Sequence, residues 1–164
     1  MKNNDHSQNG SNPDMPASFV ETTFHVRYAE TDQMGIVHHS AYVVWLEEGR
    51  SQWMRAHGSS VVQFEQDGLR LAVSEICLRY HQPARYDQRV TVRCGVARVR
   101  SRQIQFNYAI VDAETGATLV TAYTQHICVD EAGNVTKISD KWRLFLRQDL
   151  LVITLSRPDR RAMC

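Results

Sequence analysis

The order of hydrophobic periodicities along the chain is the feature that most restricts its fold. Residues 19–28 alternate between apolar and polar side chains, which is the two-residue period of a half-buried strand. A single long run with helical spacing follows, over about residues 41–57. Four further strand-like runs come next, at residues 69–81, 88–99, 103–111 and 119–129. This order of elements predicts an α+β fold.

The long helical run is bounded by residues that start and stop helices. Ser40 has the side chain of a helix N-cap, and Gly58 favours a stop at the other end. Between them the apolar residues recur at spacings of three and four and form one face: Tyr42, Trp45, Leu46, Gly49, Trp53 and Met54. At about 1.5 Å per residue the helix spans roughly 25–28 Å, which is enough to cross a whole sheet.

The four later runs alternate as strands do, and we interpret them as a four-strand meander. The connections at residues 112–116 and 130–134 carry the Asp, Asn and Gly residues of hairpin turns. Because the helix and one sheet face must bury each other, we expect an antiparallel five-stranded sheet wrapped around one long central helix. Residues 140–150 predict an additional C-terminal helix, and the apolar stretch that follows them is left unassigned.

Length and composition predict one domain between two less regular ends. The chain has 164 residues, of which 43% are hydrophobic, a size and composition that suit a single core. Residues 1–17 are rich in Asn, Ser, Gly, Pro and Asp, so we interpret them as a flexible N-terminal tail. We assign residues 18–138 to the folded domain and residues 139–164 to a C-terminal helix and tail.

These properties also limit what the protein binds and where it works. A net charge of +1 gives no reason to expect nucleic acid, and no stretch approaches the roughly 18–20 apolar residues that membrane insertion requires. The four cysteines are widely spaced without a C-x-x-C pair, which suits a reducing cytosol and a cytoplasmic location. Only His38 and His39 adjoin, without a helical metal motif, so we expect neither a metal nor a cofactor.

The segment between the first strand and the helix carries the candidate chemistry. Asp32 lies in a loop that contains Gly35, a residue that permits a turn which other residues resist. The loop leads directly into the predicted helix, whose first free N–H groups lie near His39 and Ser40. Such a helix start carries partial positive charge and can hold the oxyanion that develops when a carbonyl is attacked. A carboxylate beside these donors therefore suggests acyl transfer.

The same segment resembles a known family. The motif consists of Tyr28, Asp32, Gly35, Val37, His39 and Tyr42 at their spacings in this chain. It is similar to the 4-hydroxybenzoyl-CoA thioesterase branch of the hotdog superfamily, and especially to bacterial acyl-CoA thioesterases associated with the Tol–Pal system. The resemblance runs from about residue 24 to residue 129. It implies a hotdog fold and hydrolysis of an acyl-CoA, or a closely related acyl thioester, to a free acid.

The resemblance also implies roles for individual residues. Asp32 takes the place of the family's catalytic carboxylate, either as a nucleophile that forms a mixed anhydride or as a general base that activates water. His39 and Tyr28 correspond to the other two residues of the family's site, and the backbone amide of His39 corresponds to the group that polarises the carbonyl. The residues alone leave both mechanisms open, and they leave open the acyl group.

Two other functions remain as alternatives. A hotdog hydratase uses an Asp and a His about five residues apart, whereas Asp32 and His39 are seven apart. A non-catalytic hotdog protein that binds acyl-CoA as a sensor would need a DNA-binding segment that residues 1–17 do not supply. Thiol release from acyl-CoAs separates a thioesterase from both alternatives.

The resemblance further implies a CoA-binding turn and an assembly. In the family, the turn between the third and fourth strands contacts the nucleotide of CoA, and Arg100, Ser101 and Arg102 occupy the matching turn. Guanidinium groups suit this task because they bind phosphate oxygens in forked pairs. A homodimer with joined sheets and sites at the subunit junction, or a homotetramer, is the expected assembly, since a lone subunit leaves a sheet edge uncovered.

Overall fold

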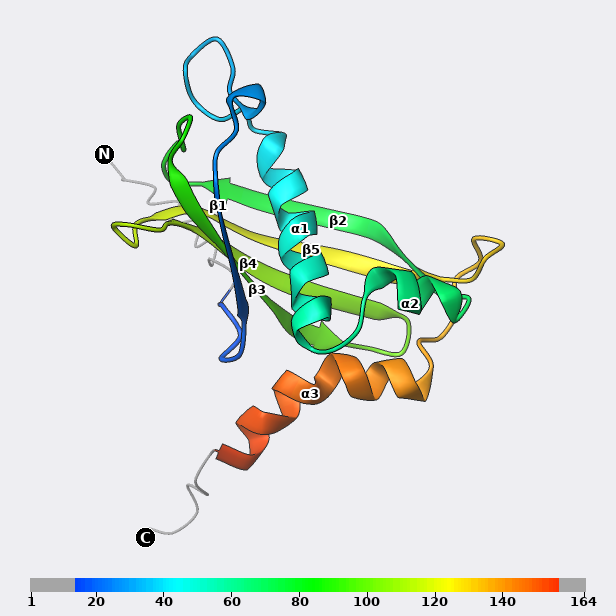
Figure 1. The fold of residues 1–164 in the computed structure, drawn as a ribbon. Helices are drawn as coiled ribbons and strands as arrows, with labels where there is room; N and C mark the ends of the chain where they lie inside the picture. Colours follow the sequence, from blue (N-terminus) through cyan, green and yellow to red (C-terminus); the bar gives the residue numbers. More distant parts are fainter. Residues whose placement is uncertain (1–13, 157–164) are drawn as a thin grey trace, which may run out of the picture.

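A computed structural model describes residues 14–156 of the chain, with side chains described through residue 150. Five antiparallel strands form one sheet that curves around a long helix, and two further helices lie at its margins (Figure 1). This confirms the predicted α+β architecture of a five-stranded antiparallel sheet around one central helix. No helix in the described part of the chain is long and apolar enough to cross a membrane.

The strands lie close to the predicted runs. Their bounds are Val20–His25 for β1, Arg70–Tyr80 for β2, Arg89–Val99 for β3, Gln103–Asp112 for β4 and Thr118–Val129 for β5. The burial of β1 and β3 agrees with their periodicity because the apolar face of each lies under the helix, whereas β2 is mostly exposed. In β3, for example, Val90, Val92 and Cys94 are fully buried against the core.

The predicted four-strand meander is wrong in one respect. The strand order across the sheet is β1-β3-β4-β5-β2, so only β3, β4 and β5 form a meander. β2 pairs with β5 at the far edge, and residues 81–88 then carry the chain back to β3. Strand alternation indicates which face of a strand is buried, but it does not indicate which neighbour the strand pairs with.

The central helix α1 extends over Ala41–Ala56, close to the predicted run. Gly58 follows it with φ +83°, a left-handed conformation that suits the predicted stop. Gly49 faces β3 so closely that an added Cβ would lie 2.7 Å from Val92 Cγ1. The predicted apolar face is buried as a set: Tyr42, Trp45, Leu46, Gly49, Trp53 and Met54. Glycine therefore lets the middle of the helix approach β3 closely.

The other two helices cover the end of the core farthest from the Asp32 loop. α2 (Val61–Gln66) is capped by Ser60, whose hydroxyl accepts a hydrogen bond from the Gln63 amide at 3.2 Å. α3 spans Asp140–Ser156, so it includes the predicted helix and continues beyond residue 150. It is tied to α1 by the buried Trp53 indole, whose Nε1 donates to Asp149 Oδ2 at 3.0 Å.

The predicted N-terminal tail falls mostly outside the described residues. Its last four residues, 14–17, are described and run along the outer face of the sheet. The carbonyl of Asp14 accepts a hydrogen bond from Asn107 Nδ2 at 2.8 Å, and Pro16 lies against Gly95. The predicted division at residues 18–138 and 139–164 remains a prediction, although α3 begins at Asp140.

Candidate active site

The loop that carries Asp32 is a tight hairpin between η1 (Tyr28–Glu30) and α1. Its arms are joined by a bridge between Thr31 and Val37, and the Asp32 amide donates to the Ile36 carbonyl at 2.9 Å. The amide of Gly35 closes the turn on the Asp32 carbonyl at 2.9 Å, and Gly35 has φ +72°. A side chain resists this left-handed conformation, so the glycine fixes the turn that presents Asp32.

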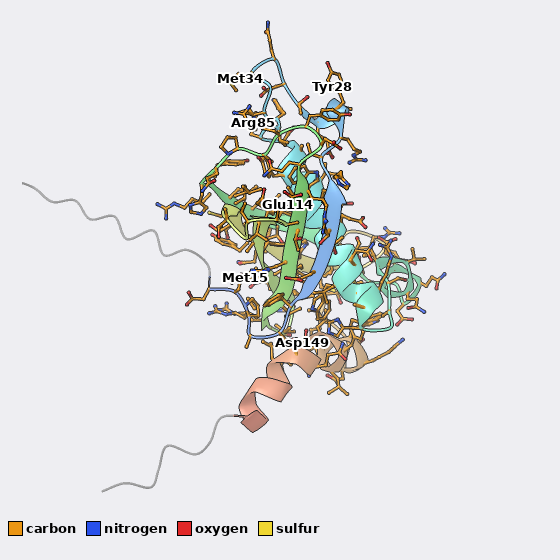
Figure 2. The ribbon with its side chains drawn as sticks, turned by 60° about the vertical axis from the view of Figure 1, so that its left-hand side comes forward. Met15, Tyr28, Met34, Arg85, Glu114 and Asp149 are labelled. Atoms are coloured by element: carbon orange, nitrogen blue, oxygen red, sulfur yellow. The ribbon has the colours of Figure 1, made fainter. Side chains whose placement is uncertain are left out.

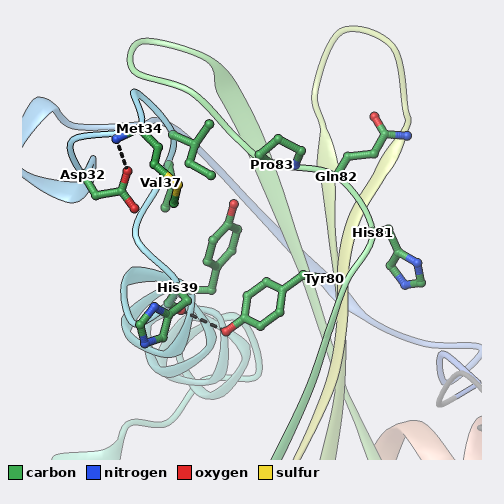
Figure 3. Close-up of a pocket in the computed structure, with 10 residues that line it drawn as sticks. Asp32, Met34, Val37, His39, Tyr80, His81, Gln82 and Pro83 are labelled. Carbon is green, nitrogen blue, oxygen red and sulfur yellow. Dashed lines mark hydrogen bonds between the residues drawn. The ribbon is translucent and has the colours of Figure 1, made fainter.

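The Asp32 carboxylate is held through one of its two oxygens. Oδ1 accepts a hydrogen bond from the Met34 amide at 2.8 Å (Figure 3). Among the residues that the structure describes, none donates a hydrogen bond to Oδ2. One oxygen thus orients the group, while the other is available to a substrate or a water molecule.

Residues 38–40 form the start of α1 beside this carboxylate. The amide of His38 donates to the Glu30 carbonyl at 2.8 Å, and the amide of Ala41 donates to the His38 carbonyl at 2.9 Å. The N–H of His39 has no hydrogen-bond acceptor in the described part of the chain. This free donor lies just before the first turn of α1, near the positive end of the helix. The carbonyl-polarising role that the resemblance implies for it stays a prediction.

The predicted N-cap role of the Ser40 side chain is wrong. Ser40 occupies the N-cap position, but its backbone is already helical, with φ −72° and ψ −25°, and its side chain caps no amide. Its hydroxyl lies 2.8 Å from His38 Nδ1 instead. A capping side chain reaches the first-turn amides from an extended backbone, and the helical conformation of Ser40 directs its hydroxyl elsewhere.

Asp32 and His39 line the same pocket, which has a volume of about 310 Å³. Ile36 and Val37 of the loop and Tyr42 of α1 supply its apolar wall. The remaining wall comes from β2 and the link after it, through Tyr80, His81, Gln82 and Pro83 (Figure 3). A carboxylate, a free amide donor and an apolar wall together suit an ester-like substrate with a hydrophobic acyl group.

Tyr28 does not line this pocket in the single chain. Its ring is 77% exposed and packs edge to face on Tyr86, with the two centroids 5.5 Å apart. Its carbonyl accepts hydrogen bonds from the Thr31 amide and hydroxyl, at 3.1 Å and 2.8 Å. Tyr28, Met34 and Arg85 gather at one end of the molecule, far from Asp149 (Figure 2). The predicted role of the Tyr28 side chain therefore stays a prediction.

Glu30 is a structural residue of the site that sequence reasoning missed. Its carboxylate pairs with Arg27 at 2.6 Å and accepts a hydrogen bond from Trp45 Nε1 at 2.9 Å. Burial works to raise the pKa of the Glu30 carboxyl, but the hydrogen bonds from Arg27 and Trp45 outweigh it, and the pKa lies below its usual value. Glu30 therefore fastens the beginning of the Asp32 loop to the first turns of α1.

The resemblance gives no role to two further tyrosines at the site, Tyr80 and Tyr42. The Tyr80 hydroxyl donates to the His39 carbonyl at 3.0 Å, and the Tyr42 hydroxyl accepts from the Ala84 amide at 3.0 Å. Their rings pack edge to face with centroids 5.4 Å apart. Only Tyr42 belongs to the local motif; Tyr80 ends β2, 41 residues after His39, and no local pattern points to it.

The predicted CoA-binding turn lies at the opposite end of the sheet. The Asp32 loop follows β1 beside Arg89, the first residue of β3, whereas Arg100, Ser101 and Arg102 follow the last residue of the same strand. At about 3.3 Å per residue, the 11-residue strand places them roughly 35 Å apart. A single chain thus does not bring this turn to the Asp32 pocket.

Possible metal ligands do not gather at this site. In residues that the structure describes, no group of three or more His, Cys, Asp or Glu side chains is arranged to hold a metal ion. The chemistry considered for the pocket therefore rests on Asp32, His39 and backbone donors.

The chain is similar to known proteins over most of its length. The family described as "Thioesterase-like superfamily" matches residues 26–148. A Bacillus subtilis protein named "Putative acyl-CoA thioesterase YneP" is 35% identical over 106 residues, which cover 65% of this chain and 76% of that protein. "Acyl-CoA thioester hydrolase YbgC" of Escherichia coli O157:H7 is 30% identical over 105 residues, covering 64% and 78%. The crystal structure of the hypothetical protein TT1821 from Thermus thermophilus superposes with a TM-score of 0.73 at 35% identity, covering 77% and 95%.

Proposed function

The chain belongs to the thioesterase-like superfamily and has the hotdog fold, and from this premise we propose that it hydrolyses an acyl-CoA thioester to a free acid and CoA. We assign it to the 4-hydroxybenzoyl-CoA thioesterase branch, of the Tol–Pal-associated type, on the motif from Tyr28 to Tyr42. The names of YneP and YbgC, which align with about three quarters of their length, support an acyl-CoA substrate.

One observation carries the proposal. Asp32 and His39 line one pocket. In the described chain, one oxygen of the Asp32 carboxylate accepts no hydrogen bond and the backbone N–H of His39 donates none. Thioester hydrolysis needs a group that attacks or activates water and a donor for the oxygen that becomes negative. A helix start supplies that donor without reorganisation, because its amide is already unpaired.

Asp32 acts in one of two ways in this proposal. As a nucleophile, its carboxylate attacks the thioester carbonyl, the C–S bond breaks, and the thiolate of CoA leaves; water then hydrolyses the mixed anhydride. As a general base, Asp32 removes a proton from a water molecule, which attacks the same carbon and releases the thiolate. In both cases the oxyanion develops on the former carbonyl oxygen and accepts a hydrogen bond from the His39 N–H.

Side chains of two motif residues assist in this proposal. His39 hydrogen-bonds to the carbonyl, the water or the carboxylate, which its place in the pocket wall supports. Tyr28 positions the acid or the substrate, and its exposed ring at the same end of the molecule leaves it open to contact from a bound ligand or a second subunit.

A homodimer is part of the proposal because β2 is a long uncovered edge. Within residues 14–156, β2 pairs only with β5, and Val73, Ile76 and Tyr80 are 52%, 40% and 49% exposed. A long edge strand with apolar side chains is a template for pairing with another chain. Pairing of two β2 strands would join the sheets and would place partner residues next to the Asp32 pocket, since Tyr80 lines it. A homotetramer would consist of two such dimers. Light scattering after size-exclusion chromatography measures the number of subunits in the assembly.

The same assembly allows the turn of Arg100, Ser101 and Arg102 to bind the phosphates of CoA. Because these residues lie far from Asp32 within a chain, they act on the substrate of the partner subunit. Mixing an Asp32→Asn subunit with an Arg100→Ala, Arg102→Ala subunit tests this, since a mixed dimer then contains one intact site. Recovery of activity that neither variant has alone supports the shared site, and no recovery contradicts it.

The proposed activity is tested by following free thiol release from a panel of aromatic, short-chain and medium-chain acyl-CoAs. We expect release by the wild-type protein and a loss of at least about 100-fold in kcat for Asp32→Asn, which keeps the shape of the side chain but removes its charge. Equal release by both would refute the role of Asp32. Tight binding without release by the wild type would favour a sensor, and water addition to an enoyl-CoA would favour a hydratase.

A cytoplasmic location completes the proposal. Among the described residues, Cys77, Cys94 and Cys128 are free thiols, which suits a reducing compartment.

A further inference from the structure

Tyr80 links the edge of the sheet to the start of the central helix. It is the last residue of β2, and its hydroxyl donates a hydrogen bond to the His39 carbonyl at 3.0 Å (Figure 3). The ring also lines the pocket that contains Asp32. This hydrogen bond therefore connects the end of β2 directly to the segment that leads into α1.

The orientation of the Tyr80 ring is fixed from one side. Tyr42 packs against it edge to face, with the planes at 72°, and Tyr42 is itself buried and hydrogen-bonded to the Ala84 amide. Burial raises the pKa of the Tyr80 phenol, so the hydroxyl keeps its proton and remains a donor.

Each residue before α1 is held by a different part of the fold. Val37 donates its amide to the Ala84 carbonyl at 2.9 Å, and His38 donates its amide to the Glu30 carbonyl at 2.8 Å. For His39 the bond from Tyr80 is the one hydrogen bond to its backbone in the described chain. The unpaired N–H of His39 shares a peptide plane with the His38 carbonyl, which accepts a hydrogen bond from the Ala41 amide at 2.9 Å. Tyr80 holds the next peptide plane, on the other side of the His39 Cα, so the two bonds together set the backbone of His39 from both sides.

We infer that Tyr80 is a positioning residue of the thioesterase: its hydroxyl fixes the backbone of His39 so that the free N–H meets the developing oxyanion. The inference rests on the proposed function and goes beyond it, because it assigns a role to a residue outside the loop motif. A donor that is misplaced by a fraction of an ångström polarises the bound carbonyl less, and it loses still more of its stabilisation of the transition state.

Tyr80→Phe tests this by removing one oxygen atom and leaving the packing against Tyr42 intact. Removing an oxyanion donor costs about 100- to 1000-fold in kcat, so displacing one should cost about 10-fold. We expect that fall in kcat with KM changed less than about 2-fold. The matched control is Tyr123→Phe, which removes the hydroxyl that Tyr123 donates to Glu75 on another part of the same sheet; its kcat should equal that of the wild type.

A spectroscopic readout separates positioning from a purely structural tie. In the inactive Asp32→Asn background, the infrared stretch of a ¹³C-labelled thioester carbonyl reports its polarisation. Adding Tyr80→Phe should shift this band back toward its frequency in free acyl-CoA. A thermal midpoint measured in parallel shows whether the variants are folded. An unshifted band, or a kcat equal to that of the Tyr123→Phe control, overturns the inference.

A second variant tests the hydrogen bond without removing it. Difluorotyrosine at position 80 keeps the ring and the hydroxyl but has a lower phenol pKa, so alkaline pH converts it to an acceptor-only phenolate. We expect a reversible alkaline fall in kcat that the wild type lacks, and an unchanged pH profile overturns the inference. If the wild-type protein releases no thiol from any acyl-CoA, the proposed function fails instead, which is a distinguishable result.

Discussion

Gly49 gives the sharpest test of how α1 is seated on the sheet. Replacing glycine by alanine inside a helix normally stabilises a protein by about 0.8–1.0 kcal/mol, because alanine loses less backbone entropy. Here the new Cβ would lie 2.7 Å from Val92 Cγ1, about 1 Å closer than the usual contact between carbon atoms. Val92 is 0% exposed and β-branched, so it has little freedom to rotate away.

The overlap should outweigh the gain in helix propensity. Forcing an extra methyl group into a packed core costs about 1–3 kcal/mol. We therefore expect Gly49→Ala to lower the free energy of unfolding by about 1–2 kcal/mol, which corresponds to a fall of roughly 2–8 °C in Tm. Urea denaturation followed by tryptophan fluorescence measures the first quantity, and calorimetry measures the second.

A double-mutant cycle with Val92→Ala isolates the contact. Without Cγ1, the nearest atoms to the new Cβ are Cys94 Cβ at 3.5 Å and the Cβ of residue 92 at 3.7 Å, which are ordinary distances. Gly49→Ala should then stabilise the Val92→Ala protein by about 0.5–1 kcal/mol, so the coupling energy is about 1.5–3 kcal/mol. The reasoning is refuted if Gly49→Ala has the same sign in both backgrounds.

Three further predictions concern acid stability, helix docking and the Asp32 turn. Burial lowers the pKa of His126 to about 3, with Arg50 as a second cause, so only the unfolded chain binds the proton between about pH 6.5 and 3. As the pH decreases through this range, the free energy of unfolding of the wild type should decrease by about 1.4 kcal/mol per pH unit, and urea midpoints of His126→Gln should lack this contribution. Asp149→Ala leaves the buried indole N–H of Trp53 without its acceptor and should lower the free energy of unfolding by about 1–3 kcal/mol, whereas an unchanged urea midpoint would show that the bond is not needed. Gly35→Ala meets open space but must adopt φ +72°, so it should cost about 1–2 kcal/mol and lower thiol release through Asp32; full activity would contradict this.

The elements could be predicted from the sequence because one face of each is buried. In α1 the six apolar positions at helical spacing are the six buried positions, and β3 begins and ends within one residue of its run. The position of β2 could not be predicted in this way. Its burial pattern is mostly exposed, since it forms an edge that α1 does not cover, and its pairing with β5 joins residues 40 to 59 positions apart. Local periodicity carries no information about that partner.

Part of the candidate site could likewise be predicted from the sequence, and part of it could not. The sequence placed Asp32 and the amide of His39 together because the loop of a few residues between them allows little else. It did not indicate the groups that hold this loop. Tertiary hydrogen bonds do so, among them those from Trp45 to Glu30, from Val37 to Ala84 and from Tyr80 to His39.

These hydrogen bonds explain why the loop motif alone does not give the geometry of the site. The amide of Val37 reaches Ala84 only when residues 81–88 cross the end of the sheet, and Tyr80 reaches His39 only when β2 has paired with β5. The geometry of the loop therefore depends on the long-range pairing of β2 with β5 as well as on the loop's own turn at Gly35. A chain with the same loop but without an aromatic hydroxyl at the end of β2 would retain the carboxylate and lose the fixed direction of the donor beside it. The reactive groups of this site thus lie in one short segment of the sequence, and hydrogen bonds from the end of the sheet help to align them.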